Sequence, residues 1–461
     1  MADIFEVSKL ILAEGPVCDH CLGRQFAKLS TGLSNDERGK AVKLFFAMEG
    51  DRLFKETADP ALLEELAPSN ANANKTLFAA KARTDLPAQE KCWVCGDIFK
   101  NLDFWADMAV SKLDGIDYST LLVGTKLSGL LSENEEILWE ACGTAYAEQL
   151  KSELNREIGK IISKKTGKDV AFSNPDMMIT FDIAKKEVQI DVRSVYIYGR
   201  YLKLVRGIPQ TKWPCRKCGG RGCDSCGGTG KQYQESVGEL AGLPLLSSKY
   251  AEAYDVVFHG AGREDIDALM LGTGRPFVME AKSPKHRQFD LAALEKEIND
   301  TNAGKIEVHG LTFCGKDLVE KLKGEKAKKT YRLKIRFESP VTEDHLNHAL
   351  LQLHETEINQ DTPNRVLHRR ADLCRNRTVH TAILEQMGDK KNRTNNPNPA
   401  ENSVVESCVA YVRIFCDGGL YVKELTSGDE GRTTPSIAGL LDVGAKVEEL
   451  DVIDVDLEAA D

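Results

Sequence analysis

Four Cys-x-x-Cys pairs stand out in the sequence, because thiolates at this spacing are typical metal ligands. The first two pairs lie about 70 residues apart and together supply four thiolates, the ligand set of a tetrahedral structural zinc ion. We therefore predict a zinc site that closes this part of the chain into a loop. Its ligands are Cys18, Cys21, Cys92 and Cys95. The alternative is that one pair is simply buried cysteine.

A second cysteine group lies in the segment CRKCGGRGCDSCGGTG, which contains the pattern Cys-x-x-Cys-x-Gly-x-Gly twice. The glycines allow the backbone to bend tightly around four sulfurs, so we predict a second metal site here. Its ligands are Cys215, Cys218, Cys223 and Cys226. The same repeat occurs in the zinc region of J-domain chaperones, so it does not separate an enzyme from a binding protein. A flexible basic linker whose thiols bind nothing is the simpler alternative.

The segment Gly-Arg-Glu-Asp at residues 262–265 predicts a turn after a strand, with a carboxylate beside a guanidinium. A nearby positive charge keeps an aspartate ionised, and therefore able to act as a nucleophile or base, even when it is desolvated. Asp265 and Asp267 are two residues apart and would face the same side of an extended chain. On residue types alone, a solvated charged turn is the simpler interpretation.

Patterns of apolar residues divide the chain into four regions that must position these groups. They are a zinc-stapled unit at 1–100, an α+β module at 101–206, a basic Cys- and Gly-rich linker at 207–232, and a large domain at 233–461 that ends in an acidic tail. The last region has the many strands and few helices of an α+β domain built on antiparallel strands. The predicted fold class is therefore multi-domain α+β.

Three predicted elements within these regions can be compared directly with a structure. The pattern predicts one long helix over residues 137–165 and a strand over 196–201 that belongs to the α+β module. It also predicts a short strand over 420–425, after a Gly-Gly turn.

Composition excludes several classes of protein. Hydrophobic residues make up 42% of the 461 residues and charged residues 29%, which fits neither a disordered nor a membrane protein. Apolar runs stay far below the 18 or so residues of a membrane span, and the first residues resemble no export signal. We expect a cytoplasmic protein without membrane contact.

The formal net charge is −10, yet positive charge is concentrated locally. The basic segments are 200–231, 316–336 and 365–377, with net charges of +7, +6 and +4. Residues 442–461 carry −7, so an acidic tail accounts for much of the deficit. The basic patches are therefore local, and the negative total does not describe the whole surface.

Several common signatures are missing from the sequence. It contains no Gly-x-x-x-x-Gly-Lys-Ser/Thr and no Gly-x-Gly-x-x-Gly, so no motif indicates that the protein binds nucleoside triphosphates or dinucleotides. It also contains no Gly-x-Ser-x-Gly. These absences disfavour methyltransferases and thiouridine synthases that need such cofactors.

Over essentially its whole length the chain resembles the archaeal-type tRNA pseudouridine synthases that act on uridines 54 and 55 of the T loop. Six segments carry the resemblance, in the same order as in that family. They are CDHCLGRQFAKL from Cys18, CWVCGDIF from Cys92, GRYLKLVRGIPQTKWPCRKCGGRGC from Gly199, GREDIDALMLGTGRPFVMEAKSP from Gly262, HRRADLCRNRTV from His368, and YVKELTSGDEGRTTPS from Tyr421. The resemblance implies a THUMP RNA-binding module followed by a pseudouridine-synthase catalytic domain with a mixed, mainly antiparallel sheet.

The resemblance also implies roles for individual residues. Asp265 closes the family's Gly-Arg-x-Asp turn and would be the catalytic aspartate, Tyr331 would stack on the target base, and Lys423 would pair with the aspartate. The remaining expected substrate-binding residues are Tyr421, Arg263, Arg275, Arg369, Arg370 and Arg432. Leu269 stands where the family pattern has an arginine, so a phosphate contact of the turn is expected to differ.

Together these features predict an isomerase that needs no catalytic cofactor, with one or two structural Zn²⁺ ions. Its partner would be the T arm of tRNA, bound by a monomer. The sequence leaves open whether position 54, position 55 or both are modified. A non-catalytic, zinc-containing RNA-binding or chaperone-like protein is the alternative from another class. No J-domain His-Pro-Asp accompanies the cysteine repeat, which weakens its chaperone version.

Overall fold

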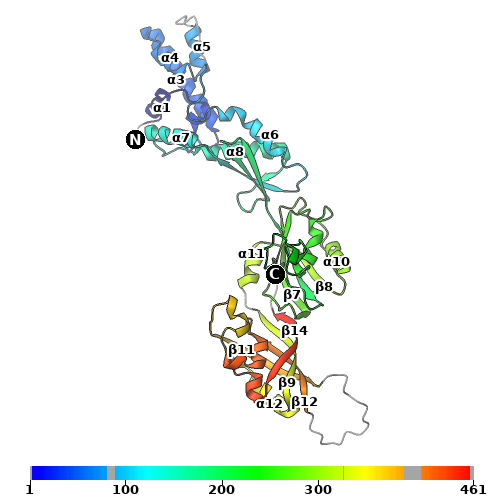
Figure 1. Cartoon of the computed structure of the whole chain (residues 1–461). Helices are drawn as coiled ribbons and strands as arrows, with labels where there is room; N and C mark the ends of the chain where they lie inside the picture. Colours follow the sequence, from blue (N-terminus) through cyan, green and yellow to red (C-terminus); the bar gives the residue numbers. More distant parts are fainter. Residues whose placement is uncertain (1–2, 80–88, 325–326, 389–405, 457–461) are drawn as a thin grey trace. The chain divides into compact units, whose positions relative to one another are not determined.

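The computed structural model describes residues 3–79, 89–324, 327–388 and 406–456 (Figure 1). Its contacts divide the chain into two compact units, Met1–Arg193 and Ser194–Asp461. None of the helices in these described ranges is both long and apolar enough to cross a membrane.

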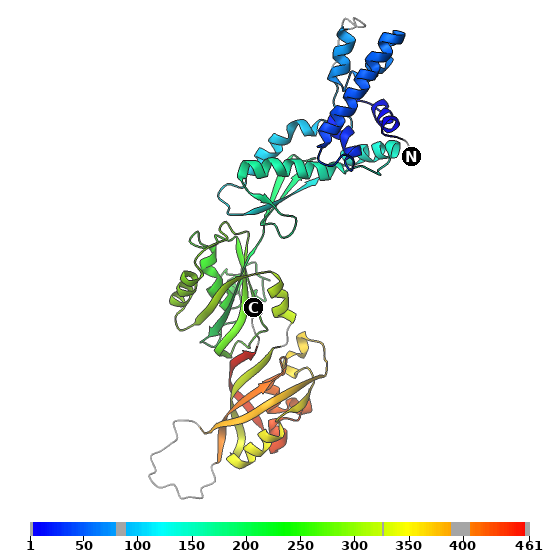
Figure 2. The same ribbon diagram turned by 180° about the vertical axis from the view of Figure 1, so that it is seen from behind.

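The first unit consists of helices and one small sheet, and only some of the helices pack against the sheet (Figures 1 and 2). Its α-helices are α1 (Ile4–Ala13), α2 (Asp19–Gly23), α3 (Asn35–Thr57), α4 (Ala61–Leu66), α5 (Ala71–Ala79), α6 (Leu102–Val110), α7 (Gly129–Cys142) and α8 (Leu150–Thr166). The predicted single helix over 137–165 is wrong, because α7 ends at Gly143, whose φ of 76° is available to glycine at low cost.

The sheet of the first unit has the order β2-β1-β3-β4. Its strands are β1 (Thr120–Lys126), β2 (Asp169–Val170), β3 (Met177–Asp182) and β4 (Glu187–Val192). Every second residue of β1 and β3 is buried, and α8 buries Leu154, Ile158 and Ile162, so an apolar sheet face and an apolar helix stripe form the core. The same core contains Cys21 and Cys95. Residues that we predicted as separate regions thus share one hydrophobic core.

The second unit is built on one large sheet. Its strands are β5 (Val195–Lys203), β6 (Asp255–Gly260), β7 (Leu269–Lys282), β8 (Ile306–Cys314), β9 (Lys328–Thr342), β10 (Thr356–Gln360), β11 (Arg375–Met387), β12 (Glu406–Cys416), β13 (Thr433–Thr434) and β14 (Ala445–Asp456). The order is β13-β10-β11-β12-β9-β14-β7-β5-β8, with β6 on β7. Pairing is antiparallel except between β14 and β7, so the sheet is mixed as expected.

Strand β5 differs from the prediction in its place. It pairs with β7 and β8 of the large sheet, and the division between units falls after Arg193. Residues 194–206, which the sequence pattern grouped with the α+β module, therefore belong to the second unit. Nothing in the local sequence of a strand specifies which of two sheets it joins.

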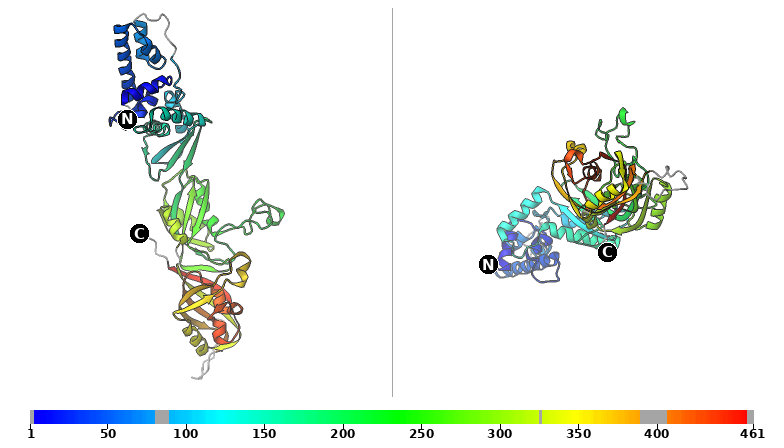
Figure 3. Two further views of the ribbon diagram at one scale, coloured as in Figure 1. Left: turned by 90° about the vertical axis from the view of Figure 1, so that its left-hand side faces the viewer. Right: turned by 90° about the horizontal axis from the view of Figure 1, so that it is seen from below.

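Helices pack on the strands of the large sheet. They are α9 (Val237–Gly242), α10 (Leu291–Thr301), α11 (Asp317–Gly324), α12 (Glu343–Gln352), α13 (Val422–Ser427) and α14 (Ile437–Leu441). Two hydrophobic cores result, one around Phe277 and Ile298 and one around Leu346 and Ile414. In the left view of Figure 3 a green loop, near residue 220 on the colour bar, extends away from the sheet. This loop contains the second cysteine group.

Candidate active site and metal centres

A cavity of about 510 Å³ opens in the second unit where β7, β9 and β14 meet. It is lined by the turn between β6 and β7, by the first residues of β9, and by the segment that leads into α13. Of the expected site residues, seven line it: Arg263, Asp265, Arg275, Tyr331, Arg370, Tyr421 and Lys423. Asp267 and Lys423 lie 156 positions apart in the sequence and meet here, because β14 pairs with both β7 and β9 and α13 packs on β14.

Two carboxylates and two cations form an open cluster in this cavity. Lys423 Nζ lies 3.2 Å from Asp265 Oδ2 and donates hydrogen bonds of 3.1 and 2.8 Å to the carboxylate oxygens of Asp267. Arg365 Nη1 lies 3.6 Å from Asp265 Oδ2. Burial opposes ionisation of Asp267, but its hydrogen bond and ion pair with Lys423 outweigh this and lower the pKa of its carboxyl. The side chain of Asp265 stays 38% exposed, so it can be reached from the cavity.

The backbone of the turn explains why a glycine precedes Arg263. Gly262 has a φ of +73°, a region that L-residues rarely adopt, and a Cβ there would lie 3.3 Å from both Arg275 Nη1 and Lys329 Nζ. Ala268 N donates to Asp265 O and closes the turn before β7 begins at Leu269. The chain therefore reverses between β6 and β7 as predicted, with its hydrogen-bonded turn at 265–268 and not within the Gly-Arg-Glu-Asp segment itself.

A second charged cluster is buried directly beneath the turn. Glu264 Oε2 accepts a hydrogen bond of 2.7 Å from the Tyr201 hydroxyl and lies 2.9 Å from Arg275 Nε. Lys203 Nζ lies 3.8 Å from Glu264 Oε1 and donates to the carbonyl oxygens of Asp265 and Ile266, each at 3.2 Å. Burial lowers the pKa of Lys203. All the charged side chains of this cluster are at most 1% exposed, so it fixes the turn from below.

Two tyrosines lie on the walls of the cavity. Tyr331 is half-buried on β9, and burial raises the pKa of its phenol above the usual range. Tyr421 is the N-cap of α13, and its hydroxyl accepts a hydrogen bond of 3.0 Å from Arg370 Nη1.

The predicted strand over 420–425 is wrong, because the chain enters helix α13 at Val422. Val422, Leu425 and Thr426 are buried at helical spacing, and Gly428 ends the helix in the left-handed conformation. Lys423 therefore reaches the turn from the first turn of a helix.

The other expected arginines fall into different environments. Arg263 stacks on Trp213, with its guanidinium carbon 4.5 Å from the ring centroid. Arg275 is buried with Glu264 and donates to Ala261 O at 2.9 Å. Arg432 does not line the cavity, since it pairs with Asp372 and donates to Thr362 O at 3.0 Å. The side chain of Arg369 lies outside the described structure.

Several cavity residues were not predicted. Arg365 holds Asp265 on one side and Glu424 Oε1, at 2.5 Å, on the other. It lies in the arginine-rich segment 365–377, but nothing local separates it from its neighbours. Lys329 and Trp213 also line the cavity. Both residues lie in basic segments of the sequence. Such segments indicate RNA binding, but they do not indicate that these two residues line the cavity.

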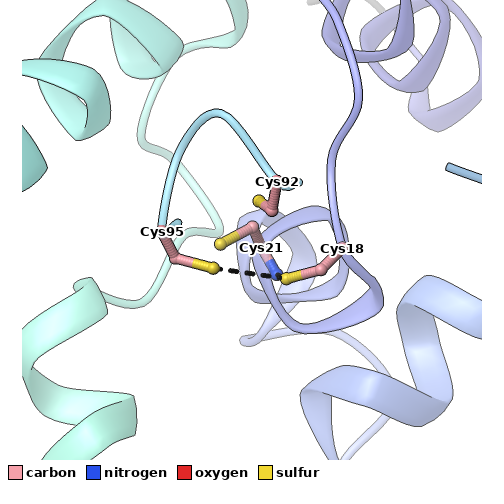
Figure 4. A group of neighbouring side chains, drawn as sticks. All are labelled: Cys18, Cys21, Cys92 and Cys95. Atoms are coloured by element: carbon pink, nitrogen blue, oxygen red, sulfur yellow. Dashed lines mark hydrogen bonds between the residues drawn. The ribbon is translucent and has the colours of Figure 1, made fainter. Parts of the chain in front are cut away.

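The first cysteine group assembles as predicted (Figure 4). The four sulfurs of Cys18, Cys21, Cys92 and Cys95 lie within 4.8 Å of one another, and those of Cys18 and Cys95 are 3.6 Å apart. Tetrahedral zinc with Zn–S bonds of about 2.3 Å separates its sulfurs by about 3.8 Å. Three of these residues are buried in the core, and the four thiols fit a metal ion.

The second group also assembles, within a few residues of chain. The sulfurs of Cys215 and Cys223, and of Cys218 and Cys226, are 4.0 Å apart. Backbone N–H groups of Gly222, Cys223 and Gly230 donate to the sulfurs at 3.2 Å, which favours thiolates. This group too fits a metal ion.

These features define a two-unit α+β protein whose cavity holds a cation-paired carboxylate between aromatic side chains. The sequence model "Pus10, C-terminal" matches residues 196–456, and "Pus10 THUMP domain, archaeal" matches residues 105–182. The THUMP module expected within 101–206 is thereby confirmed.

Curated relatives match nearly the whole chain. The "tRNA pseudouridine synthase Pus10" of Methanothrix thermoacetophila is 47% identical and covers 98% of this chain and 95% of its own. Its namesakes from Halorubrum lacusprofundi and Methanocaldococcus jannaschii are 41% and 37% identical, covering 99% and 96% of this chain and 97% and 93% of their own. The chain belongs to the Pus10 family of tRNA pseudouridine synthases, which are isomerases. The resemblance found from the sequence is confirmed.

Proposed function

We propose that this enzyme isomerises uridine 54, uridine 55 or both in the T loop of tRNA, with Asp265 as the catalytic carboxylate. The observation that carries the proposal is the position of Asp265, in a cavity between Lys423 at 3.2 Å and Arg365 at 3.6 Å. Lys423 and Arg365 thus bring two positive charges close to this carboxylate. An ionised carboxylate is the group needed to capture or stabilise a sugar carbon that develops positive charge.

The reaction exchanges one bond for another. The C1′–N1 bond breaks with its electron pair going to the base, the base turns, and C5 bonds to C1′. The C5 proton is lost to solvent and N1 gains one, so product and substrate are isomers and no redox agent is required. The carboxylate of Asp265 faces C1′ throughout and limits escape of the sugar cation.

The target nucleotide must leave the T-loop stack to reach the carboxylate. Tyr331, on the cavity wall, offers a face for the extruded base, and stacking of this kind contributes about 1–3 kcal/mol. Tyr421 and Arg370 are linked by a 3.0 Å hydrogen bond at the cavity wall and would bind the flanking backbone.

The partner would be the T arm of tRNA, bound by a monomer, and the basic segments support the binding of a nucleic acid. On the loop with the second cysteine group, Lys212, Arg216 and Lys217 are exposed, and this loop joins the cavity through Trp213. Exposed cations of this kind would contact phosphates, so we expect affinity for tRNA to fall steeply with salt.

Both cysteine groups would hold structural Zn²⁺. The first would staple distant parts of the first unit, and the second would stiffen the loop beside the cavity. Metal analysis should give two zinc ions per chain, and one in each of the variants Cys18→Ser and Cys215→Ser. If the parent protein holds one ion and Cys18→Ser holds none, the second cysteine group does not bind zinc.

Incubation with unmodified tRNA transcript, followed by chemical mapping of pseudouridine, tests the proposed function. The intact protein should modify position 54, 55 or both, and Asp265→Ala should modify neither while still binding tRNA. Equal product from Asp265→Ala would refute the assignment of the catalytic residue. Binding without product from the intact protein would favour a non-catalytic RNA-binding protein.

A further inference from the structure

Lys329 is a basic residue in the catalytic cavity with no role in the proposal above. It is the second residue of β9 and stands two positions before Tyr331, so both side chains leave the strand on the same side. Both line the cavity that contains Asp265. A base stacked on Tyr331 would therefore lie within reach of the Lys329 ammonium.

The ammonium of Lys329 has no hydrogen bond or ion pair among the residues that the structure describes. The groups nearest to it in electrostatic terms come from three elements: Arg275 on β7, Glu264 in the turn, and the thiol of Cys416, the register partner of Lys329 on β12. Glu264 is already engaged by Arg275 and by the Tyr201 hydroxyl. Glu264 Oε1 accepts no hydrogen bond in the described part of the chain, yet Lys329 does not donate to it, so the ammonium donors can meet a group that enters the cavity.

The backbone beside Lys329 is shaped to leave room for the amine. A side chain at Gly262 would meet Lys329 Nζ and Arg275 Nη1 at 3.3 Å, so the two cationic groups are close neighbours across a bare stretch of backbone. Burial and the charge of Arg275 lower the pKa of Lys329 to about 8. An ammonium in this position is stabilised when an acceptor, preferably an anionic one, enters the cavity.

We propose that Lys329 donates a hydrogen bond to a carbonyl oxygen of the uracil as it leaves C1′, and so stabilises the detached base. This rests on the proposed function. When the C1′–N1 bond breaks, its electron pair passes to the base, and the negative charge spreads over N1 and the two carbonyl oxygens. A positioned cation acts on charge that develops only in this step, and therefore raises the rate more than the affinity. Lys329 forms no covalent bond and exchanges no proton in this role.

The test uses the full-length protein and a tRNA transcript, with excess enzyme so that one turnover is measured. Lys329→Met should slow pseudouridine formation about 100-fold or more, which is the usual cost of removing one positioned donor. Its affinity for tRNA should stay within about twofold. Lys329→Arg, which keeps the charge, should recover most of the rate. Lys446→Met, the same change at an exposed lysine of β14, should match the parent protein.

The dependence on pH separates this role from a structural one. If the ammonium is needed, the single-turnover rate of the parent enzyme falls as pH rises through about 8, because the amine then loses its proton. The Lys329→Arg variant should keep its rate through the same range, since arginine stays charged. This comparison holds even if Lys329→Met fails to fold.

Three results would overturn the inference. One is a Lys329→Met enzyme with an unchanged single-turnover rate. Another is a Lys329→Met enzyme whose affinity falls while its rate at saturation is kept, which would place the amine on a phosphate. The last is an identical fall in rate with pH for the parent and Lys329→Arg. If the parent protein forms no pseudouridine at all, the proposed function fails together with this inference.

Discussion

Two adjacent carboxylates, Glu264 and Asp265, belong to charged clusters of opposite character. The side chain of Glu264 is fully buried with Arg275 and Lys203, whereas that of Asp265 is 38% exposed beside Lys423. Successive side chains of an extended segment face opposite sides, so one turn serves both clusters. The buried cluster fixes the backbone, and the open cluster presents a reactive group. Charged groups on the buried side of this turn stabilise its backbone, and charged groups on the cavity side are available for catalysis.

The largest effect on stability is expected from Glu264→Gln. The change leaves Arg275 and Lys203 as two buried cations without their carboxylate, which costs about 3–5 kcal/mol of unfolding free energy. Denaturant unfolding measures it, with Glu430→Gln at an exposed position as control. A loss below about 1 kcal/mol would show that the buried cluster does not hold the turn.

A smaller loss, about 2–3 kcal/mol, is expected from Lys203→Met. This variant keeps the Glu264–Arg275 pair but removes the donor to the carbonyls of Asp265 and Ile266. Catalysis should fall as well, about tenfold, because the turn that carries Asp265 is less well fixed. Unfolding and single-turnover rates are measured on the same preparation. If the single-turnover rate is unchanged while the unfolding free energy falls, the buried cluster does not affect catalysis through the turn.

Lys423→Gln should reverse this pattern, with a large effect on rate and a small one on stability. The lysine is partly exposed, so its ion pairs contribute about 1 kcal/mol or less to unfolding free energy. Asp265 loses its nearest cation but keeps Arg365 at 3.6 Å, and we expect a rate reduced about 10–100-fold. A Lys423→Gln protein that is destabilised as strongly as Glu264→Gln would contradict the comparison.

The smallest effect is expected from Asp267→Asn. Its side chain is 67% exposed, and its pairing with Lys423 should contribute about 0.5 kcal/mol at neutral pH. Because the pKa of Asp267 is lowered in the folded protein, this contribution is present above the unfolded pKa and disappears as pH falls through the folded one. Unfolding curves of parent and variant should therefore converge in acid. A constant difference at every pH would mean that the charge of Asp267 is irrelevant.

The sequence was informative where a motif is local. The Gly-Arg-Glu-Asp turn and both cysteine groups are compact patterns, and the resemblance supplied Lys423 and Tyr331. Arg365 and Lys329 were missed because their positions depend on which strands pair, and pairing is not encoded in a short window. The segment 420–425 was misread for a related reason: its apolar residues fit a strand as well as a helix, and only the Gly428 C-cap points to α13.

The role of Asp265 is tested most directly by one turnover of Asp265→Asn on tRNA transcript, with pseudouridine quantified at positions 54 and 55. The side chain keeps its size and loses only its charge, so the variant should fold and bind tRNA within about twofold of the parent. We expect its rate to fall by at least about a thousandfold, the order seen when a catalytic nucleophile is removed. Product at a rate within tenfold of the parent would contradict a catalytic carboxylate at this position.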